Sequence, residues 1–413
     1  MFNTLEQKYG KWIVLLDQMV YSGNGFLLTI ILAKLLNVNE FGIFSSIILV
    51  SYLTISFVSA LVLQPFQVNI SKHENIQEYI SFTWWLILKL IFVITTVSWV
   101  LFELDLLNAY YHYKYPIVLF SSLLLFQDYF RKIFLSLQKT IYALIIDSFA
   151  VAFQIFCLGY LYINQSFDLK NVFISLGFSF IVPLIFSIVI LKPKLIKSSS
   201  YKGFAQLHLN EGLWLVLVAF LQWCSSNFFV MVSGVFIGMH ALGALRLVQS
   251  IFGVLNMLLQ TFENYVLPSF SKLYHVSELK ASRYLKNITI KAGALFTLVL
   301  LVLFVFADSI ILLVGDQKYA DYSFVIRWMS ILYLIIYLGY PVRMYIRVLS
   351  LNKYFFIGYL LSFTFSVLSF SFLLKNYELT GAVIGLIINQ ILMIFFWQYQ
   401  LVLKNKQPWK LFI

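Results

Sequence analysis

Long apolar stretches, separated by short polar segments, make up most of this 413-residue chain. A helix needs about 20 mostly apolar residues to cross the hydrocarbon core of a bilayer. We predict twelve membrane-spanning helices, at residues 12–35, 42–66, 81–102, 115–135, 141–163, 171–191, 212–236, 241–267, 287–308, 322–342, 354–374 and 379–402. The loops between them are too short for a separate domain, so the pattern indicates an all-α, multi-pass membrane protein.

Lysine and arginine gather on alternate loops. Most of the 29 basic residues flank the predicted helices on one side, and the other side holds only a few, such as Lys34 and Lys318. Short loops rich in Lys and Arg remain in the cytoplasm, so both termini are predicted to be cytoplasmic. Lys89 is the one basic residue well inside a predicted span.

The composition excludes some classes of function. Hydrophobic residues make up 61% of the chain and charged residues 11%, whereas soluble domains average about 25% charged residues. The formal net charge of +12 comes mainly from loops that face anionic lipid headgroups, so no nucleic-acid partner is expected. Cys157 and Cys224 fall inside predicted spans and are expected to be packing residues, and the scattered histidines share no metal-ligand spacing. No metal or cofactor is predicted.

The chain divides into two related halves. We predict an N-terminal six-helix lobe at residues 1–191, a basic cytoplasmic linker at 192–210 and a C-terminal six-helix lobe at 211–413. Short strings recur in the same order: Ser22–Phe26 with Ser225–Phe229, Gly42 with Gly243, Ser71–Lys72 with Ser271–Lys272, and Ser136–Lys139 with Ser350–Lys353. An even number of spans per half gives both lobes one orientation, related by a pseudo-two-fold axis along the membrane normal, which is a transporter plan.

The eighth span carries a polar stripe. At helical spacing one face collects Arg246, Gln249, Gly253, Asn256, Gln260, Glu263 and Asn264. A charge at mid-bilayer costs on the order of 2.5–3.5 kcal/mol on insertion scales, so this face is not expected to contact lipid. Hydrogen bonding between helices and the wall of a hydrated cavity both explain it, and the charges favour the cavity.

Other charged positions leave two interpretations open. In the first span Asp17, Tyr21 and Asn24 form one polar face, while Gln18, Ser22, Gly25 and Thr29 form a second face suited to close helix packing. Lys89 is either a cavity cation or a structural residue. Three further groups are most simply explained without substrate: an interfacial cluster of Gln127, Asp128, Arg131 and Lys132, the buried pair Asp147 and Gln154, and the topology charges Arg343 and Arg347.

Enzyme signatures are missing from the sequence. It contains no G-x-x-x-x-G-K-[ST] phosphate loop, no G-x-S-x-G and no H-E-x-x-H. A membrane enzyme also needs a sizeable aqueous loop for its site. The sequence therefore predicts a transporter and not an enzyme.

Three segments carry a family resemblance. Asp17–Phe44, with D-Q, S-G-N-G-F, L-A-K and E-F-G-I-F, resembles the opening of bacterial polysaccharide-biosynthesis flippases of the multidrug/oligosaccharidyl-lipid/polysaccharide exporter superfamily. Here Gly25 precedes Phe26, and Lys34 replaces the usual arginine. Ala241–Pro268 and Asp128–Lys139 also resemble these proteins. The specific motifs occupy under a quarter of the chain and do not identify the sugar.

This resemblance implies a flippase of the bacterial cytoplasmic (inner) membrane. Its substrate would be an undecaprenyl-diphosphate-linked oligosaccharide repeat unit of an O-antigen (lipopolysaccharide), capsule or exopolysaccharide. Two lobes would move it to the outer leaflet by alternating access. A polysaccharide polymerase and chain-length proteins are candidate partners.

The expected site residues follow from these points. Arg246 is the first candidate for a diphosphate or sugar contact, since guanidinium binds phosphate through paired hydrogen bonds. Lys89 is the second cation, and the candidate polar contacts are Gln249, Asn256, Gln260 and Asn24. Asp17 and Glu263 are candidates for coupling to H⁺ or Na⁺.

Three other functions are weighed against this one. A cation-coupled multidrug exporter of the same superfamily would have a similar outline. A lipid II flippase usually carries two further spans, and a polymerase or ligase would need a large outer loop.

Overall fold

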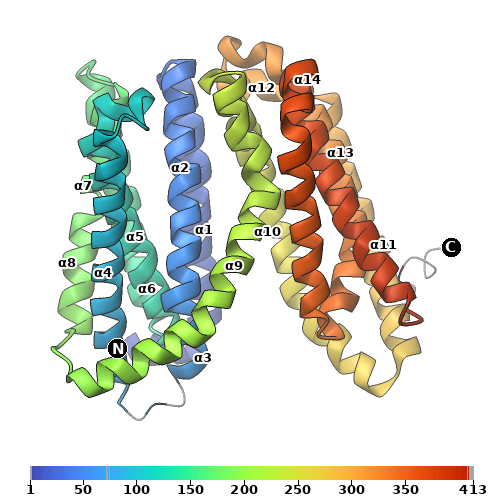
Figure 1. Ribbon diagram of the computed structural model, residues 1–413, viewed down its shortest axis with the longest axis horizontal. Helices are drawn as coiled ribbons and strands as arrows, with labels where there is room; N and C mark the ends of the chain where they lie inside the picture. The colour runs from blue at the N-terminus through green and yellow to red at the C-terminus, as the bar shows by residue number, and fades with distance from the viewer. Residues whose placement is uncertain (1, 71–72, 74, 407, 409–413) are drawn as a thin grey trace. The chain divides into compact units, whose positions relative to one another are not determined.

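The computed structural model describes residues 2–70, 73, 75–406 and 408. Within them every regular element is helical, which confirms the all-α prediction (Figure 1). The chain forms two compact units: unit 1 is Met1–Leu28 with Ile47–Phe220, and unit 2 is Thr29–Ser46 with Leu221–Ile413.

Unit 1 is built around α5. In chain order its helices are α1 (Phe2–Leu35, whose end belongs to unit 2), α2 (Val38–Val58, whose start belongs to unit 2), the π-helix η1 (Ser59–Leu63), α3 (Gln64–Asn69), α4 (Ile76–Glu103), η3 (Asn108–Tyr113), α5 (Lys114–Ser136), α6 (Thr140–Ile163), α7 (Leu169–Phe178), α8 (Ile181–Leu191) and the first part of α9 (Ser198–Phe236). Helix α5 packs against α4, α6, α7 and α8, so its side chains are largely enclosed.

Unit 2 is built around α13 in the same way. It contains the rest of α9, then α10 (Met239–Val276), α11 (Glu278–Val305), α12 (Ala307–Gly315), η4 (Gln317–Tyr322), α13 (Ser323–Val348) and α14 (Asn352–Val402). Helix α13 packs against α10, α11, α12 and α14. The central helix of each unit is thus surrounded by its neighbours, and polar side chains such as Gln127, Asp128 and Arg131 on α5 are buried.

The helices match the predicted spans closely. Within the part of the chain that the structure describes, ten stretches are long and apolar enough to cross a membrane. Helix α5 also has the length but carries several charges, and α14 is counted once although it contains two predicted spans. The backbone of α14 turns at Glu378 (φ 47°, ψ −128°). Gly381 permits this turn, because a Cβ there would lie 2.1 Å from the carbonyl oxygen of Leu373.

The turn between α1 and α2 contains the E-F-G motif and depends on its residues. Asn37 and Glu40 form a reciprocal cap: the Asn37 side chain accepts from Glu40 N at 2.8 Å, and Glu40 accepts from Asn37 N at 3.4 Å. Gly42 follows, and a Cβ there would lie 2.0 Å from the Met239 carbonyl oxygen. A Cβ on Gly243 would lie 3.2 Å from Gly42 Cα, so these two repeat-related glycines are in contact. Ser71 and Lys72 of another repeated pair lie outside the described residues.

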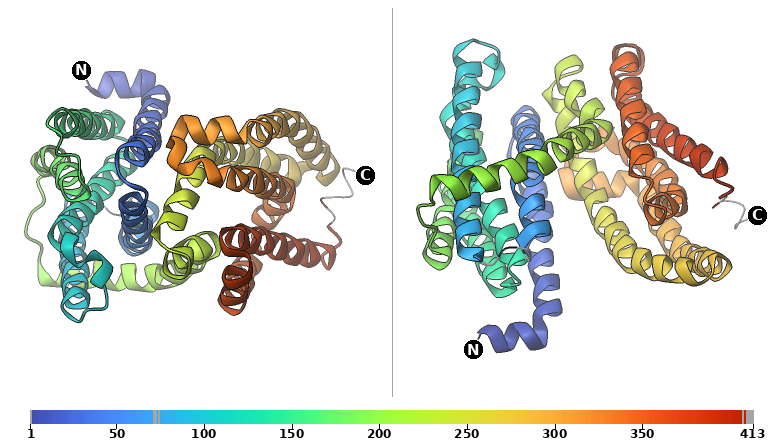
Figure 2. Two further views of the ribbon diagram at one scale, coloured as in Figure 1. Left: turned by 90° about the horizontal axis from the view of Figure 1, so that it is seen from above. Right: turned by 60° about the horizontal axis from the view of Figure 1, so that its bottom comes forward.

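The region predicted as a linker is largely helical. Helix α9 begins at Ser198, and its first part crosses the ends of α3 and α4 in unit 1 (Figure 2). Phe204 stacks on Tyr79 with ring centroids 4.7 Å apart. His208 is buried and bonds Tyr79 Oη at 2.8 Å and the carbonyl of Leu61, in η1, at 2.9 Å. The carbonyl contact fixes this part of α9 against the π-helix.

Candidate functional site

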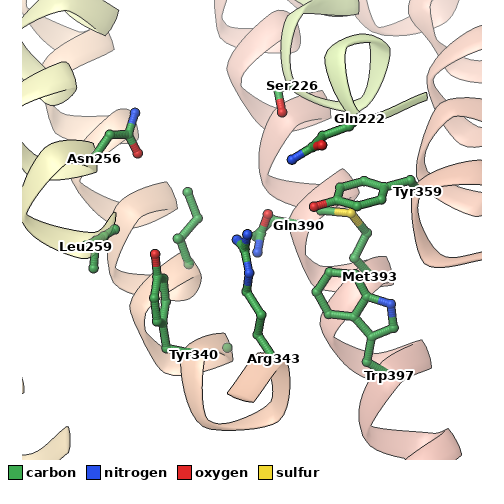
Figure 3. A pocket seen from close by; sticks show the side chains of 12 residues that line it. Gln222, Ser226, Asn256, Leu259, Tyr340, Arg343, Tyr359, Gln390, Met393 and Trp397 are labelled. Atoms are coloured by element: carbon green, nitrogen blue, oxygen red, sulfur yellow. The ribbon is translucent and has the colours of Figure 1, made fainter. Parts of the chain in front are cut away.

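Unit 2 contains a cavity of about 170 Å³ between α9, α10, α13 and α14 (Figure 3). Its lining residues are Gln222, Ser226, Asn256, Leu259, Ile336, Gly339, Tyr340, Arg343, Tyr359, Gln390, Met393 and Trp397. They combine several amides, one guanidinium and three aromatic rings. No carboxylate stands among these described lining residues.

Arg343 gives the cavity its charge. It extends from α13 between Tyr340 on one side and Tyr359 and Gln390 on the other (Figure 3). Its side chain is 26% exposed, and its Nε is buried with no hydrogen-bond partner among the described residues. Nε faces the Glu263 carboxylate at 3.6 Å without a hydrogen bond, and the guanidinium lines the cavity, where it is suited to an anionic or oxygen-rich ligand.

Glu263 holds two arginines at the edge of this site. Its carboxylate pairs with Arg347, and its Oε2 lies 3.6 Å from Arg343 Nε. The Glu263 side chain is only 8% exposed. Two cations and one carboxylate leave this cluster with a formal excess of one positive charge.

The other predicted residues of the eighth span are placed differently. Asn256 lines the cavity and donates to Tyr333 Oη at 2.7 Å. Arg246 donates to Gln249 Oε1 at 3.0 Å. Arg246, Gln249 and Gln260 are not among the described residues that line the cavity. The side chain of Asn264 lies outside the described part.

Unit 1 contains a second charged cluster, deep among α1, α5 and α6. Arg131 donates to Asp17 Oδ2 at 2.6 Å and to Asp147 Oδ2 at 2.7 Å. The exposed fractions of these side chains are 8% for Arg131, 1% for Asp17 and 3% for Asp147. Two carboxylates around one guanidinium leave a formal excess of one negative charge.

Neutral groups complete the shell of this cluster. Gln127 donates to Asp147 Oδ1 at 2.7 Å, Gln18 accepts from Arg131 at 3.2 Å, and the Arg131 guanidinium lies 4.1 Å from the Tyr21 ring centroid. Asp17 Oδ1 is buried and has no hydrogen-bond partner among the described residues. That oxygen is therefore available for a proton or a small cation.

Asn24 belongs to a neighbouring amide chain. It donates to Gln154 Oε1 at 2.8 Å, and Gln154 in turn donates to Ser179 at 3.0 Å. A Cβ on Gly25 would meet nothing within 4 Å among the described residues, so the close packing expected at Gly25 is not found.

Lys89 lies on the exposed face of α4. Its Nζ donates to Tyr201 Oη at 2.9 Å and lies 4.1 Å from the centre of that ring. The structure thus pairs the mid-span lysine with the start of α9.

The sequence indicates no substrate role for Arg343 or Arg131, whereas the structure places Arg343 in the cavity wall and Arg131 between two buried carboxylates. Both are basic residues near span ends, which the positive-inside rule explains without further function. A usable signal was the set of amides inside spans, Gln222 and Gln390, which now line the cavity with Arg343. Such amides are costly in lipid and require polar neighbours.

Solved structures share this fold at low sequence identity. The lipid II flippase MurJ, in an inward closed conformation, matches with a TM-score of 0.69 and 14% identity over 99% of this chain and 89% of that chain. An inward-facing multidrug resistance MATE family transporter of the MOP superfamily gives 0.65 and 13% over 95% of both chains. A MOP superfamily transporter from Pyrococcus furiosus, described as having a binding pocket of reverse polarity, gives 0.54 and 13% over 98% and 94%.

No family model matches the chain, and no curated protein matches it. The structural likeness establishes the architecture: this chain has the two-lobe helical fold of MOP superfamily transporters.

Proposed function

We propose that this protein is a flippase that moves an undecaprenyl-diphosphate-linked oligosaccharide repeat unit from the cytoplasmic to the outer leaflet by alternating access. The observation that carries the proposal is the unit 2 cavity, which places Arg343 among amides and aromatic rings, without a carboxylate among its described lining residues. A diphosphate requires a cation, and sugar hydroxyls are bound by amides. The long polyprenyl tail can stay in the lipid.

The cavity suits part of the substrate head. Its volume of about 170 Å³ is below the roughly 300–1,000 Å³ of ordinary ligand pockets. It therefore accommodates the diphosphate with part of the adjoining sugar. Arg343 would bind phosphate oxygens, while Gln222, Asn256 and Gln390 would bind sugar hydroxyls beside the faces of Tyr359 and Trp397.

Two sources of energy are available for this step. Moving about two negative charges outward across an inside-negative membrane releases roughly 2.3 kcal/mol per charge per 100 mV. The negative cluster of Asp17, Arg131 and Asp147 in unit 1 would in addition hold a proton or Na⁺, with Asp17 Oδ1 as the open ligand. Flipping in vesicles that responds to neither a valinomycin-set potential nor an ion gradient would refute this coupling.

The test of the function compares two arginines. Arg343→Gln is expected to lower transport of a polyprenyl-diphosphate-linked oligosaccharide in reconstituted vesicles at least about tenfold, because one charge-assisted phosphate contact contributes on the order of 1.5–3 kcal/mol. Arg343→Lys should retain part of the rate. Arg246→Ala is the comparison, since Arg246 was the first candidate from sequence.

The outcomes separate the hypotheses. Loss of surface polymer in Arg343→Gln with normal polymer in Arg246→Ala assigns the head-group contact to Arg343. The converse result assigns it to Arg246. Normal transport in both variants, with normal amounts of protein in the membrane, contradicts the proposed function.

A cation-coupled multidrug exporter is the second candidate. The buried carboxylates of unit 1 and the likeness to MATE transporters favour it. Cells lacking the protein would then become sensitive to cationic drugs while keeping their surface polymer. Because a cationic drug is repelled by Arg343, the Arg343→Gln variant would transport it at an undiminished or higher rate.

A further inference from the structure

The segment between α8 and α9 is held firmly against α4. Gln77 donates its side-chain amide to the carbonyls of Leu191 at 2.8 Å and Lys192 at 2.9 Å. Lys194 N donates to Ser81 Oγ at 3.0 Å, and Trp85 Nε1 donates to the Lys194 carbonyl at 3.0 Å. Four hydrogen bonds from three turns of one helix therefore fix the course of a segment that the sequence predicts as a linker.

This fixed segment presents a row of cations. Lys192, Lys194 and Lys197 are all exposed, and Lys202 follows on the first turns of α9. Lys89 reaches the neighbouring Tyr201 from α4. None of Lys192, Lys194, Lys197 and Lys202 forms an ion pair that the described residues show, so their charges are uncompensated by protein.

An apolar stripe leads directly to these lysines. Val182, Ile185 and Val189 on α8 are 52%, 57% and 59% exposed and share one face at helical spacing. Lys192 follows directly after the end of α8, where it caps the helix in a left-handed backbone conformation. Leu195, between the lysines, is 88% exposed. Apolar surface of this kind on a membrane helix contacts acyl chains, and lysine side chains beyond the end of such a helix can extend toward the headgroups.

We propose that Lys192, Lys194 and Lys197 form a binding site for the phosphate headgroup of an anionic phospholipid of the cytoplasmic leaflet, with its acyl chains along the Val182–Ile185–Val189 stripe of α8. This site lies in unit 1 and is independent of the unit 2 cavity and of the proposed transport function. Because the hydrogen bonds to α4 fix the backbone of this segment, the entropic cost of bringing three lysines to one headgroup is lower.

The test measures lipid retention by the full-length protein in native mass spectrometry, with phosphatidylglycerol against phosphatidylcholine. Wild type is expected to retain phosphatidylglycerol preferentially. Lys192→Gln/Lys194→Gln/Lys197→Gln should weaken that retention roughly 100-fold, which is about fivefold for each basic residue at an anionic surface. The matched control Lys280→Gln/Arg283→Gln/Lys291→Gln removes the same charge from exposed positions on α11 and should leave retention near wild type.

Two further variants test the site without removing charge. Replacement of the three lysines by arginine should preserve retention, and Leu195→Ser should lower it while the charge is unchanged. Equal losses in the two glutamine triples would overturn the proposal in favour of a general attraction to basic surface. Displacement of the lipid by an equal concentration of soluble glycerol phosphate would also overturn it, by showing a site for a free anion.

Discussion

Replacing Arg131 by glutamine tests the most deeply buried ion-pair cluster in the protein's described part. The substitution removes the donor of the 2.6 Å bond to Asp17 and of the 2.7 Å bond to Asp147. It leaves two carboxylates, 1% and 3% exposed, close together without their cation. One amide cannot compensate two negative charges, so the folded state must keep them uncompensated or bind protons.

The magnitude follows from this geometry. Removing one partner of a buried ion pair costs about 3–5 kcal/mol, because the remaining charge stays buried without compensation. For a domain of 150–250 residues, 1 kcal/mol corresponds to roughly 2–4 °C in the unfolding temperature. We therefore expect Arg131→Gln to unfold roughly 10 °C below wild type.

Thermal unfolding of the purified protein in one detergent is the measurement. Lys34→Gln is the matched control: it also removes a cation from an ion pair, but the Lys34 and Asp316 side chains are 35% and 54% exposed, at 3.6 Å. Exposed pairs contribute at most about 1 kcal/mol. The triple variant Asp17→Asn/Arg131→Gln/Asp147→Asn carries no charge in the cluster and should recover most of the lost stability. A loss for Arg131→Gln no larger than that of the control, or a triple variant no more stable than the single one, would show that the buried charges do not set the stability of this cluster.

Three further predictions concern single positions. Gly42→Ala should destabilise the protein by about 1–3 kcal/mol, because its Cβ would lie 2.0 Å from the Met239 carbonyl oxygen. Gly23→Ala is the control: a Cβ there meets nothing within 4 Å, so this variant should be neutral or stabilised by up to about 1 kcal/mol. The unfolding temperatures of the two variants test this difference. Asn389→Ala should cost about 1–3 kcal/mol in the same assay, since Asn389 donates to Ser225 O at 3.2 Å and to Ser366 Oγ at 2.8 Å in a buried site. The hydrogen bond from Ser323 and the ion pair with Arg327 lower the pKa of the Asp308 carboxyl. A carboxyl with a lowered pKa stabilises the folded state above about pH 4, and this stabilisation is lost as the pH falls through the folded-state pKa. The unfolding temperature of Asp308→Asn should therefore depend less on acid pH than that of wild type.

The helices could be predicted from the sequence because their signal is local. A run of about 20 apolar residues is sufficient to identify a span, and the Asn37–Glu40 cap and Gly42 mark a helix turn within a few residues. Helix α12 was not predicted: it occupies the segment Ala307–Gly315, which is too short for any span signal.

The charged clusters could not be predicted in this way. Arg131 meets Asp17 across 114 positions of sequence, and the contact exists only because α5 is surrounded by its neighbours. Arg343 lies near the end of α13, where a topology charge is expected, and the rotation of that central helix is what directs it into the cavity. The spacing of apolar residues does not specify which side chains of different helices meet. The polar stripe of the eighth span was informative only in part, since Asn256 lines the cavity and Arg246 does not.

The charge clusters of the two units support the proposed function more strongly together than either does alone. The central helix of each unit carries a guanidinium in an ion-pair cluster, Arg131 on α5 (8% exposed) and Arg343 on α13 (26% exposed), but their surroundings differ in sign. In unit 1 one arginine lies between two carboxylates, and in unit 2 one carboxylate lies between two arginines. Ion pairs that only hold helices together would need equal numbers of positive and negative groups, because an excess charge inside a bundle is unfavourable. An excess of opposite sign in each half is explained if unit 1 binds a cation and unit 2 binds an anion. The proposed exchange of a proton or Na⁺ against a diphosphate-bearing lipid would use both sites.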